Sequence, residues 1–449
     1  MTVISSVGNL SLNTSLLNTT TLTRTASEAE PPQATTPPSS TAVTLGQTTP
    51  AAPVYSPGRL FVAPATSESQ GTLSVKTASG ALVELTPGSK GSGMQIAVKE
   101  GTLTEAERAA LEKLSDSFQK ALDGLTAQPP KLDLSALTKF NTSVLTSVDL
   151  HASVSGENKL TLDFHADSQT RSVKSTGSLG TVDISVDMSK RELHGSESQQ
   201  QRALSQYLTQ FDRAQSRGAG NSTLMTMFRD AFTALNTHYS DSASPSRNSQ
   251  QTLFISLTRS DKTMLTGLAD FKASVTQAPA TPNPMRVNEV NTFSYSVSQA
   301  TTITGTSDQN RHFTQKQQSH LTASYHKPLT AGSSLNLTTD RNSQNYLFTQ
   351  IDDKAESTTD VQYRQGALVS AMLDQSATTS TREQKYVKGW LASDTTTPQQ
   401  TAKSTDLLGQ LQAAWEKENS RVSFADYLRQ HSLPDFGTGV LLESDPQAL

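Results

Sequence analysis

The sequence predicts an α+β fold in which antiparallel β-meanders pack with amphipathic helices, behind a disordered N-terminal tail. Three observations lead to this fold class. Several segments alternate apolar and polar residues around clusters of turn-forming residues, which is typical of half-buried antiparallel strands. Other segments repeat apolar residues every three or four positions, as amphipathic helices do. Residues 1–56 are rich in Ser, Thr and Pro and low in sequence complexity, which favours an unfolded chain.

The composition limits how much of the chain can pack into a core. Only 34% of the 449 residues are hydrophobic and 6% aromatic, whereas apolar residues make up about half of a typical globular domain. We therefore expect compact domains that alternate with polar connecting segments, because polar segments cannot offset the entropy lost on ordering. The expected divisions are a disordered leader at 1–56, an α+β domain at 57–278, a Pro-rich linker at 279–288, a polar β-rich domain at 289–392, a second linker at 393–402 and a C-terminal helical segment at 403–449.

The first expected domain begins with a hairpin and a helix. The stretch TLSVKTASGALVELTP at 72–87 alternates apolar and polar residues on both sides of the turn-forming ASG, so it predicts two paired strands. A helix follows at 102–125, where Thr104 and Glu107 have the spacing of a capping box. A β-rich section is predicted next, from about 144 to 188. The apolar stripe of the helix consists of Leu111, Leu114, Phe118, Ala121, Leu122 and Leu125.

Two amphipathic helices are predicted after this β-rich section, at 200–214 and 221–239. Between them, RGAGNS at 217–222 predicts a helix C-cap, a turn and the N-cap of the next helix. A strand at 252–258 and a short helix at 262–275 complete the domain. The boundary that follows is marked by Pro279, Pro282 and Pro284.

The second expected domain again shows the alternation of β-strands. Apolar residues occupy every second position in three short segments, which are Phe293, Tyr295 and Val297; Leu321, Ala323 and Tyr325; and Leu335 and Leu337. A pair of helices is predicted at 405–418 and 423–431. Trp390 and Trp415 are expected to anchor apolar cores.

The stretch VDLHASVSGENKLTLDFHAD at 148–167 carries the candidate functional site. SGENK predicts a turn, and the apolar residues share one face of each flanking strand. A register that pairs Val154 with Leu160 brings each histidine opposite an aspartate, close enough to interact. The candidate site residues on the polar face are Asp149, His151, Asp163 and His165.

These four residues support two interpretations. Imidazoles and carboxylates are good ligands for zinc or manganese, so the face could bind a divalent metal or transfer protons. Antiparallel sheets also commonly expose one polar face, on which an Asp–His pair contributes only a few tenths of a kcal/mol. We favour the second interpretation, because the sequence shows no third strong ligand at a diagnostic spacing. We interpret a looser group, His312, His320 and His326, in the same way.

The sequence lacks the motifs of several enzyme and cofactor classes. It contains no GxxxxGK[ST], HExxH, EF-hand loop or GxSxG pattern. It also contains no cysteine, which excludes disulfides, thiolate metal sites and cysteine nucleophiles. Lys and Arg number 37 against 41 Asp and Glu, without a basic block, so we expect no nucleic-acid partner. No cofactor is expected, apart from the divalent metal of the first interpretation above.

The segments FNTSVLTSVDLHASVSG and GTVDISVDMSK, together with the Ser/Thr-rich leader, resemble a group of uncharacterised bacterial proteins. Some members of that group carry the name lactate dehydrogenase. That name implies a nicotinamide-binding fold with a His–Asp–Arg site. A dinucleotide fingerprint needs a strand, a GxGxxG turn and a helix in that order. Because RGAGN follows a helix instead, no residue of such a site can be assigned here, and the sequence argues against a dehydrogenase.

The expected function is that of a non-enzymatic binding or structural protein, associated with surface assembly in a bacterium. This expectation rests on the missing motifs, the long leader and the polar sheets. Sheet edges in the second β region could pair with a protein partner by strand addition, so we expect partner binding to depend on residues 289–375. The alternative is a metal-dependent enzyme that uses the Asp/His sheet face.

The location of the protein is expected to be cytoplasmic by default. No segment approaches the roughly 18–20 consecutive apolar residues of a membrane-spanning helix. The first basic residue is Arg24, so the N-terminus lacks the charged region of a secretory signal peptide. Export without a signal peptide is compatible with such a polar, Ser/Thr-rich leader.

Overall fold

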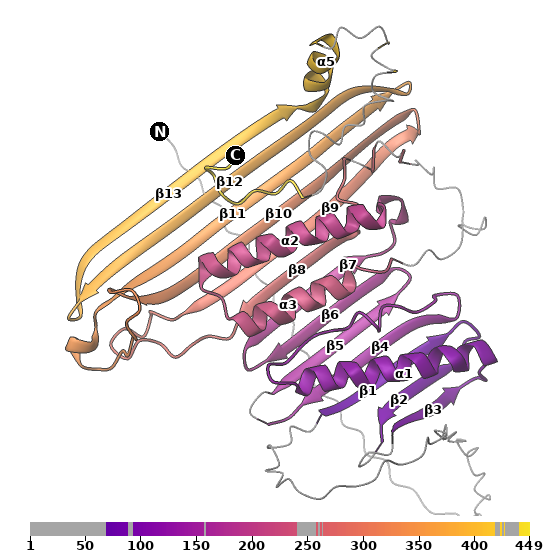
Figure 1. The fold of residues 1–449 in the computed structure, drawn as a ribbon, viewed down its shortest axis with the longest axis horizontal. Coiled ribbons are helices and arrows are strands. Elements are labelled where there is room, and N and C mark those ends of the chain that lie inside the picture. Colours follow the sequence, from indigo (N-terminus) through magenta and orange to yellow (C-terminus); the bar gives the residue numbers. More distant parts are fainter. Residues whose placement is uncertain are drawn as a thin grey trace, which may run out of the picture. The chain divides into compact units, whose positions relative to one another are not determined.

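The computed structural model describes residues 69–88, 93–156, 159–239, 257–258, 261–262, 264–417, 423, 426 and 440–449. The predicted leader at 1–56 lies outside the described residues, as do most of the predicted strand at 252–258 and of the predicted helix at 423–431. Within the described residues the fold is α+β, as predicted. Thirteen strands form one antiparallel sheet, and four helices accompany it (Figure 1).

The strands lengthen markedly in the second half of the chain. They are β1 (Ser69–Thr77), β2 (Leu82–Pro87), β3 (Met94–Glu100), β4 (Leu145–Val154), β5 (Leu160–Asp167), β6 (Thr170–Gly177), β7 (Gly180–Asp187), β8 (Asp270–Gln277), β9 (Thr292–Ser307), β10 (Asn310–Pro328), β11 (Tyr346–Arg364), β12 (Ala367–Val387) and β13 (Trp390–Asp406). The described helices are α1 (Glu105–Thr126), α2 (Glu197–Gly218), α3 (Ser222–Leu235) and α5 (Leu407–Lys417).

Most neighbours in the sheet are also neighbours in the chain. The strand order is β13–β12–β11–β10–β9–β8–β7–β6–β5–β4–β1–β2–β3. The exception arises because α1 follows β3 and the chain returns to the other side of β1, where β4 pairs with it. Helices α2 and α3 are inserted between β7 and β8, which nevertheless pair directly. The long strands β9–β13 therefore continue the sheet that the shorter N-terminal strands begin.

Local sequence signals cap the N-terminus of α1, the C-terminus of α2 and the N-terminus of α3, as predicted. Thr104 accepts a hydrogen bond from the backbone N–H of Glu107, whose carboxylate accepts one from the N–H of Thr104, so the predicted capping box is confirmed. Helix α2 ends at Ala219, which has a left-handed φ of 54°. Asn221 then caps α3 by accepting a hydrogen bond from the N–H of Leu224. The predicted turn between two helices is confirmed.

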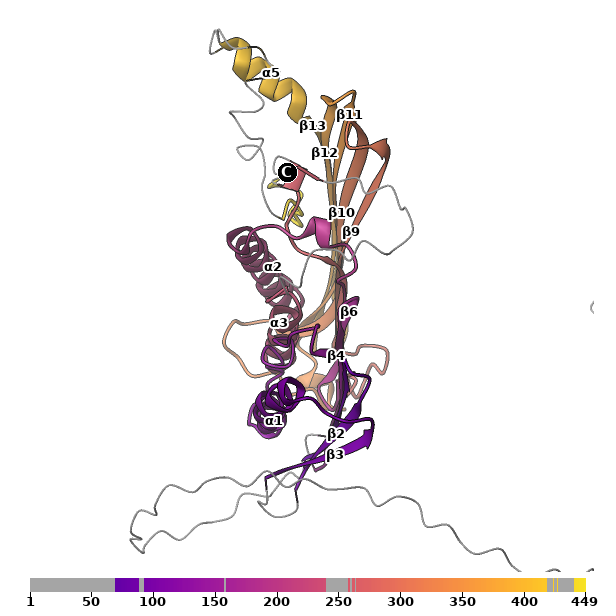
Figure 2. The same ribbon diagram turned by 90° about the vertical axis from the view of Figure 1, so that its right-hand side faces the viewer.

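Helices α1, α2 and α3 lie on the same face of the sheet (Figure 2). We call this the helix face and the opposite one the polar face. An aromatic cluster joins α2 and α3 to β8, with ring centroids 4.9 to 6.5 Å apart. Truncating one such buried ring to Ala typically costs about 3–5 kcal/mol, so this cluster is a major part of the core. Its members are Tyr207, Phe211, Phe228, Phe232 and Phe271.

A buried arginine ties α3 to the sheet. Arg171 of β6 is 3% exposed and donates to three backbone carbonyls at the last residue of α3 and just after it. Its Nη1 lies 3.1 Å from the oxygen of Leu235 and 2.7 Å from that of Thr237, and its Nη2 lies 2.7 Å from that of His238. Carbonyls at a helix C-terminus lack partners within the helix and attract cations. Arg171 therefore satisfies the unpaired carbonyl groups at the C-terminus of α3. The three hydrogen bonds described here all go to backbone carbonyls and none to a carboxylate.

Two segments that were expected to be a linker or a helix form strands. Residues 393–402, the expected second linker, lie within β13, and residues 270–275, expected in a short helix, belong to β8. In β8 the buried residues alternate with period two, so pairing with β7 and β9 outweighs the helical preference of the segment. The prediction for β13 is wrong because an edge strand that buries neither face needs no apolar alternation.

Two predictions about apolar residues are also wrong. Leu335 and Leu337 lie in the connection between β10 and β11, where they pack against a small aromatic cluster rather than forming a strand. Trp390, expected in a core, is 67% exposed and lies with its ring 4.9 Å from the guanidinium of Arg341. Trp415 on α5 is half-buried. Trp390 is the first residue of the edge strand β13, where too few neighbouring side chains surround the indole ring to bury it.

Candidate functional site

Strands β4 and β5 form the predicted hairpin in the predicted register. His151 lies opposite Asp163, and Asp149 lies opposite His165. The alternate residues of β4 point to the helix face and are buried, because a strand turns successive side chains to opposite faces. These buried residues are Val148, Leu150, Ala152 and Val154.

The four candidate residues form two separate pairs. Nδ1 of His151 lies 2.6 Å from Oδ1 of Asp163, and Nδ1 of His165 lies 2.6 Å from Oδ1 of Asp149. A longer contact of 3.4 Å joins Nε2 of His165 to Oδ2 of Asp167. The side chains of His151 and Asp163 are 69% and 63% exposed, so water competes with their hydrogen bond.

The environment of His165 favours its protonated form. Burial alone would lower the pKa of this imidazole, but its hydrogen bond to the carboxylate of Asp149 and the charges of Asp149 and Asp167 raise the pKa above its ordinary value. The two carboxylates stabilise the positive charge of the protonated imidazole. The protonated ring can donate a proton and the neutral ring can accept one on this open surface.

The pairs do not combine into a ligand cluster. Among the described residues, no group of three or more His, Asp or Glu side chains is arranged to hold a metal ion. In each pair Nδ1 already faces a carboxylate oxygen, which leaves Nε2 of His151 as the ring nitrogen open to water. The metal site at Asp149, His151, Asp163 and His165 stays a prediction, and any metal there would need further ligands from solvent or a partner.

The candidate hairpin belongs to one row of side chains that crosses the polar face. Consecutive cross-strand pairings connect residues of eleven strands in this row, which we call the polar row. Sequence reasoning missed it, because the row is set by the register of long-range strand pairs. Its members, from β1 to β13, are Thr72, His151, Asp163, Lys174, Asp183, Ser274, Ser296, His320, Lys354, Thr378 and Gln400.

Two more histidine–aspartate pairs lie between β10 and β11. Nε2 of His312 lies 2.7 Å from Oδ2 of Asp360, and Nε2 of His320 lies 2.7 Å from Oδ1 of Asp352. His326, the third histidine of this region, is buried elsewhere beside Asn291 and Glu289. The three histidines thus have three separate partners. No sequence signal marks these partners, since their residues are 32 to 48 positions apart for the first two pairs.

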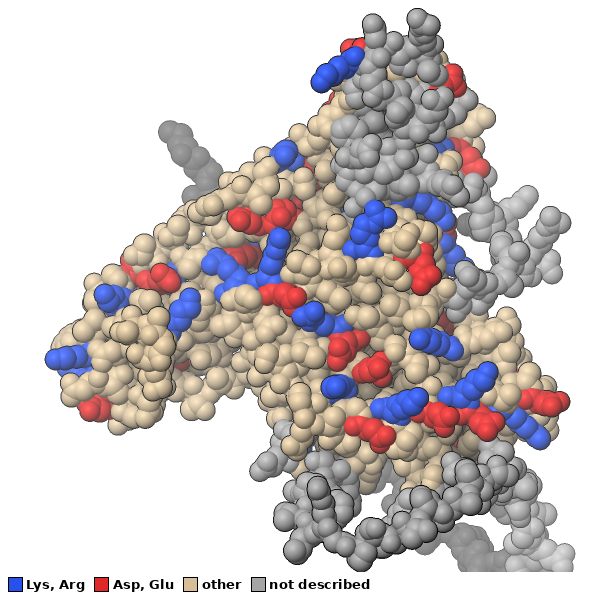
Figure 3. Space-filling model, in the orientation of Figure 1, with Lys and Arg blue, Asp and Glu red and all other residues tan. Residues whose placement is uncertain are grey.

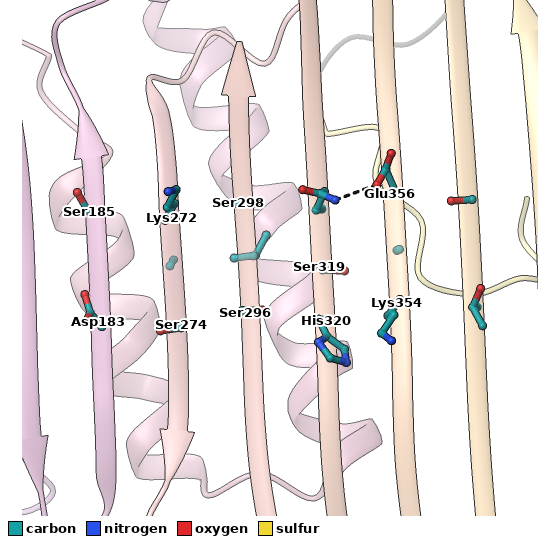
Figure 4. Close-up of a pocket in the computed structure, with 16 residues that line it drawn as sticks. Asp183, Ser185, Lys272, Ser274, Ser296, Ser298, Ser319, His320, Lys354 and Glu356 are labelled. Atoms are coloured by element: carbon teal, nitrogen blue, oxygen red, sulfur yellow. Dashed lines mark hydrogen bonds between the residues drawn. The ribbon is translucent and has the colours of Figure 1, made fainter. Parts of the chain in front are cut away.

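The polar face is hollowed where the polar row contains serines. Small side chains of β8 and β9 form the floor, and larger charged groups stand beside it (Figure 4). Gln318 donates to Glu356 at 2.8 Å. In that close-up His320 and Lys354 lie next to one another on adjacent strands. The hollow measures about 710 Å³ and is wide open to solvent. Its floor consists of Ser274, Ser296 and Ser298.

Charges of both signs intermingle on the helix face. Lys and Arg side chains lie among Asp and Glu over the coloured surface, without one continuous basic stripe there (Figure 3). Ion pairs such as Arg229 with Asp212 and Arg213 with Glu443 contribute to this mixture. No helix in the described part of the chain is long and apolar enough to cross a membrane.

The described residues therefore provide paired His and Asp groups, a serine-lined hollow and a long open sheet edge. Paired groups on an open face exchange protons with water, whereas most enzymes enclose their reacting groups. Comparison of the chain with models of protein families, with curated proteins and with solved structures gave no match.

Proposed function

We propose that the chain is a non-enzymatic binding or structural protein that recruits an extended segment of a partner protein by strand addition along β13. The observation that carries this proposal is the exposure of β13. It is 17 residues long, and all but two of these residues are exposed. It forms one end of the strand order, so one side of its backbone pairs with β12 and the other has no neighbour among the described strands.

An unpaired strand edge is a template for another strand. Its N–H and C=O groups can form backbone hydrogen bonds with any extended chain, which supplies affinity with little demand on sequence. We expected a partner strand to bind residues 289–375. These residues belong to the region of β9–β12, and each of these strands already has a neighbouring strand on both sides. The open edge in the second half of the chain is therefore 390–406 rather than 289–375.

Pro398 indicates which N–H groups of β13 are free. Proline has no N–H, so it is accommodated in an edge strand where that group would point away from the neighbouring strand. Successive N–H groups of a strand point to alternate sides in an antiparallel ladder. Pro398 pairs with Ser380 of β12, so the N–H groups of Thr396 and Gln400 point outward as well. A partner strand would bond to these groups and bypass Pro398.

The experiment removes these outward donors while keeping the β12–β13 ladder. We would compare the wild type with a Thr396→Pro/Gln400→Pro variant and with a matched Thr396→Ala/Gln400→Ala control, by affinity capture from the cells that make the protein. We expect the proline variant to lose its captured protein and the alanine control to retain it, with similar melting temperatures. Thr397→Pro should instead lower the melting temperature, because its N–H faces β12.

Two results would contradict the proposal. Capture of the same protein by the double proline variant would show that the partner does not pair with the outer edge of β13. Loss of capture in the alanine control would assign recognition to side chains instead of backbone. Light scattering of the purified chain identifies a second copy as the partner if it dimerises and only the proline variant stays monomeric.

A metal-dependent enzyme that uses Asp149, His151, Asp163 and His165 is the alternative. The short His–carboxylate contacts favour it, because a carboxylate that orients an imidazole is common beside metals and in proton transfer. The exposure of these pairs argues against it. A nicotinamide-dependent dehydrogenase is disfavoured, because no glycine fingerprint follows a strand and precedes a helix in the sequence.

A further inference from the structure

The C-terminal segment occupies a groove on the helix face. Residues 440–449 lie beside α2, over the long strands of the sheet (Figure 1). They form no helix or strand of their own. Residues 418–439 separate this segment from α5 along the chain, a length that can span roughly 70 Å when extended.

Side-chain amides of glutamines bind the backbone of the C-terminal segment. Its N–H groups donate to two of them: Val440 to Oε1 of Gln206 at 2.9 Å, and Leu441 to Oε1 of Gln317 at 3.1 Å. The glutamines come from helix α2 and strand β10. Each amide thus accepts a bond from a backbone group and not from a side chain, which is how a site binds an extended peptide of varied sequence.

Two further glutamines bind the carbonyl oxygens of the same segment. Nε2 of Gln375 donates to the oxygen of Leu441 at 2.6 Å, and Nε2 of Gln210 donates to that of Leu442 at 2.6 Å. Four amides from α2, β10 and β12 therefore converge on three consecutive residues. With the segment in place Gln317 is only 2% exposed, and its buried amide oxygen is satisfied by the segment's backbone, since a buried polar group without a partner is destabilising.

Apolar and charged contacts define which residues fit. Leu442 is 5% exposed and belongs to the large apolar core that includes the aromatic cluster described above, and Val440 packs against the same core. Leu441 packs against a separate, smaller apolar cluster. Glu443 follows and lies 3.5 Å from Nη1 of Arg213. The groove thus accepts three successive apolar residues followed by an acidic one.

The groove continues beyond the segment that fills it. A hollow of about 540 Å³ borders residues 443–448 and lies between α2 and strands β9–β13. Arg217 lines it and forms an ion pair with the largely buried Asp353, at 2.8 Å between Nε and Oδ2. Room for further residues of an extended ligand is therefore available next to the occupied part.

We propose that this groove is a peptide-binding site for extended segments of a partner protein with the pattern apolar–apolar–apolar–acidic, and that residues 440–443 fill it in cis. The proposal rests on the contacts of the C-terminal segment alone and is independent of strand addition at β13. The tethered segment competes with free peptide at an effective concentration that reaches mM for short tethers. Binding in trans is therefore weak until the tethered segment is released.

The first experiment weakens the tethered segment in the full chain. Leu442→Asp places a carboxylate at a buried apolar position. Because burying that charge is unfavourable, the substitution should release the segment from the groove. The probe is a synthetic peptide of residues 440–449, and binding is measured by fluorescence anisotropy. We expect this variant to bind the peptide at least about tenfold more tightly than the wild type does. A peptide carrying the same Leu442→Asp change should bind neither protein.

A second measurement uses a chain with an intact groove. Because the sequence contains no cysteine, Gln447→Cys introduces a single thiol at an exposed position for a fluorescent label. Added peptide should release the labelled segment and lower its anisotropy in a saturable manner. Gln210→Ala/Gln375→Ala, which removes both donors to the carbonyls, should abolish peptide binding to the Leu442→Asp variant.

Two outcomes would overturn the proposal. If the peptide binds no variant and never displaces the labelled segment, residues 440–449 are a fixed part of the fold. If the wild type forms dimers that the peptide dissociates, the occupant is the C-terminal segment of a second copy and not a different partner. Neither outcome affects the test of β13, whose proline variants leave the groove unchanged.

Discussion

Histidine–aspartate contacts recur at the residue scale on the polar face. Four of them bridge neighbouring strands: His151 with Asp163, His165 with Asp149, His312 with Asp360 and His320 with Asp352. Each is formed between side chains that the sheet brings to the same face. Pairs of this kind on exposed strands contribute roughly 0.2–1 kcal/mol each, so they support the register of the sheet rather than determine its fold.

The His165 pair predicts a small pH dependence of stability. Asp149 and Asp167 raise the pKa of His165 in the folded protein above the unfolded value of 6.5. The pair therefore stabilises the fold fully below pH 6.5, and this contribution is lost as the pH rises through the folded pKa. His165→Gln should remove a few tenths of a kcal/mol at pH 6 and almost nothing at pH 9, because the side chain is 35% exposed.

The check is the melting temperature of both proteins from pH 5.5 to 9, with the NMR titration of His165. Asp149→Asn should lower the titration midpoint, whereas Asp183→Asn, two strands away on the same face, should leave it unchanged. A midpoint below 6.5 in the wild type would contradict the prediction.

The same residues predict how the protein responds to chelators. We expect no stoichiometric metal in the purified protein and identical unfolding curves with and without EDTA, because the His–Asp pairs do not converge. A bound metal would raise the melting temperature through linkage. One equivalent of zinc or manganese, lost in an Asp163→Ala/His165→Ala variant, would instead favour the enzyme alternative.

At the scale of secondary-structure elements, one carboxylate joins helix α1 to the β1–β2 hairpin. Glu107 closes the capping box of α1 and also accepts hydrogen bonds from Ser79, at 2.9 Å from its N–H and 3.0 Å from its hydroxyl. The backbone bond from Thr104 is the main cause that lowers the pKa of Glu107 to about 2. A local helix signal thus also fixes where the helix sits against the sheet.

Glu107→Gln should destabilise the protein by about 1–2 kcal/mol at pH 7, since it replaces one acceptor oxygen by an amide NH2 donor and removes the charge. The folded pKa is depressed, so the contribution is present above pH 4.5 and is lost as the pH falls toward 2. Urea unfolding at pH 7 and pH 3 tests both statements. Glu112→Gln, at an exposed position of the same helix, is the control and should change neither value.

On the scale of the whole molecule, the sheet continues across both predicted linkers, 279–288 and 393–402. Residues 279–288 connect β8 to β9, and these strands pair with each other from Phe271 opposite Gln299 to Thr276 opposite Ser294. Asp270 adds bonds of 2.8 and 2.7 Å to the backbone N–H and the hydroxyl of Thr301. The proline-rich segment is therefore a connection between paired strands.

Cleavage of that connection tests this continuity. A protease site inserted between Thr281 and Pro282, both exposed, should be cut without separating the fragments, because the β8–β9 ladder and the shared core hold them together. Gel filtration of the cleaved protein is the measurement, and we expect co-elution in native buffer and separation in urea. Two folded fragments that elute separately in native buffer would favour the predicted two-domain arrangement.

Much of the N-terminal half could be predicted from the sequence, because its signals are local. The capping box at Thr104, the turn at Ala219 and the hairpin that pairs His151 with Asp163 each depend on residues close in the chain. The alternation of apolar and polar residues shows which side chains of a strand face the core. Once the turn is known, this two-residue period also fixes the register of the paired strands.

The second half depends on pairing between distant strands. Strand β13 and much of β9–β12 are rich in Thr, Ser and Gln, so no regular apolar alternation distinguishes a strand from a linker, as at 393–402. The partners of His312 and His320 likewise follow from a β10–β11 register that the intervening chain does not encode locally.

The α+β class, the helix caps at Thr104, Ala219 and Asn221 and the chemistry of the opening hairpin follow from the sequence alone. The tertiary structure was needed to show that thirteen strands share one sheet, that β13 is one of its edges and that the C-terminal segment lies in a glutamine-lined groove. These features depend on contacts between segments that are far apart in the chain. The sheet is held by backbone hydrogen bonds, which require no particular side chain. The glutamines of the groove lie 66 to 234 positions from the residues that they bind, so neither feature leaves a local trace in a single sequence.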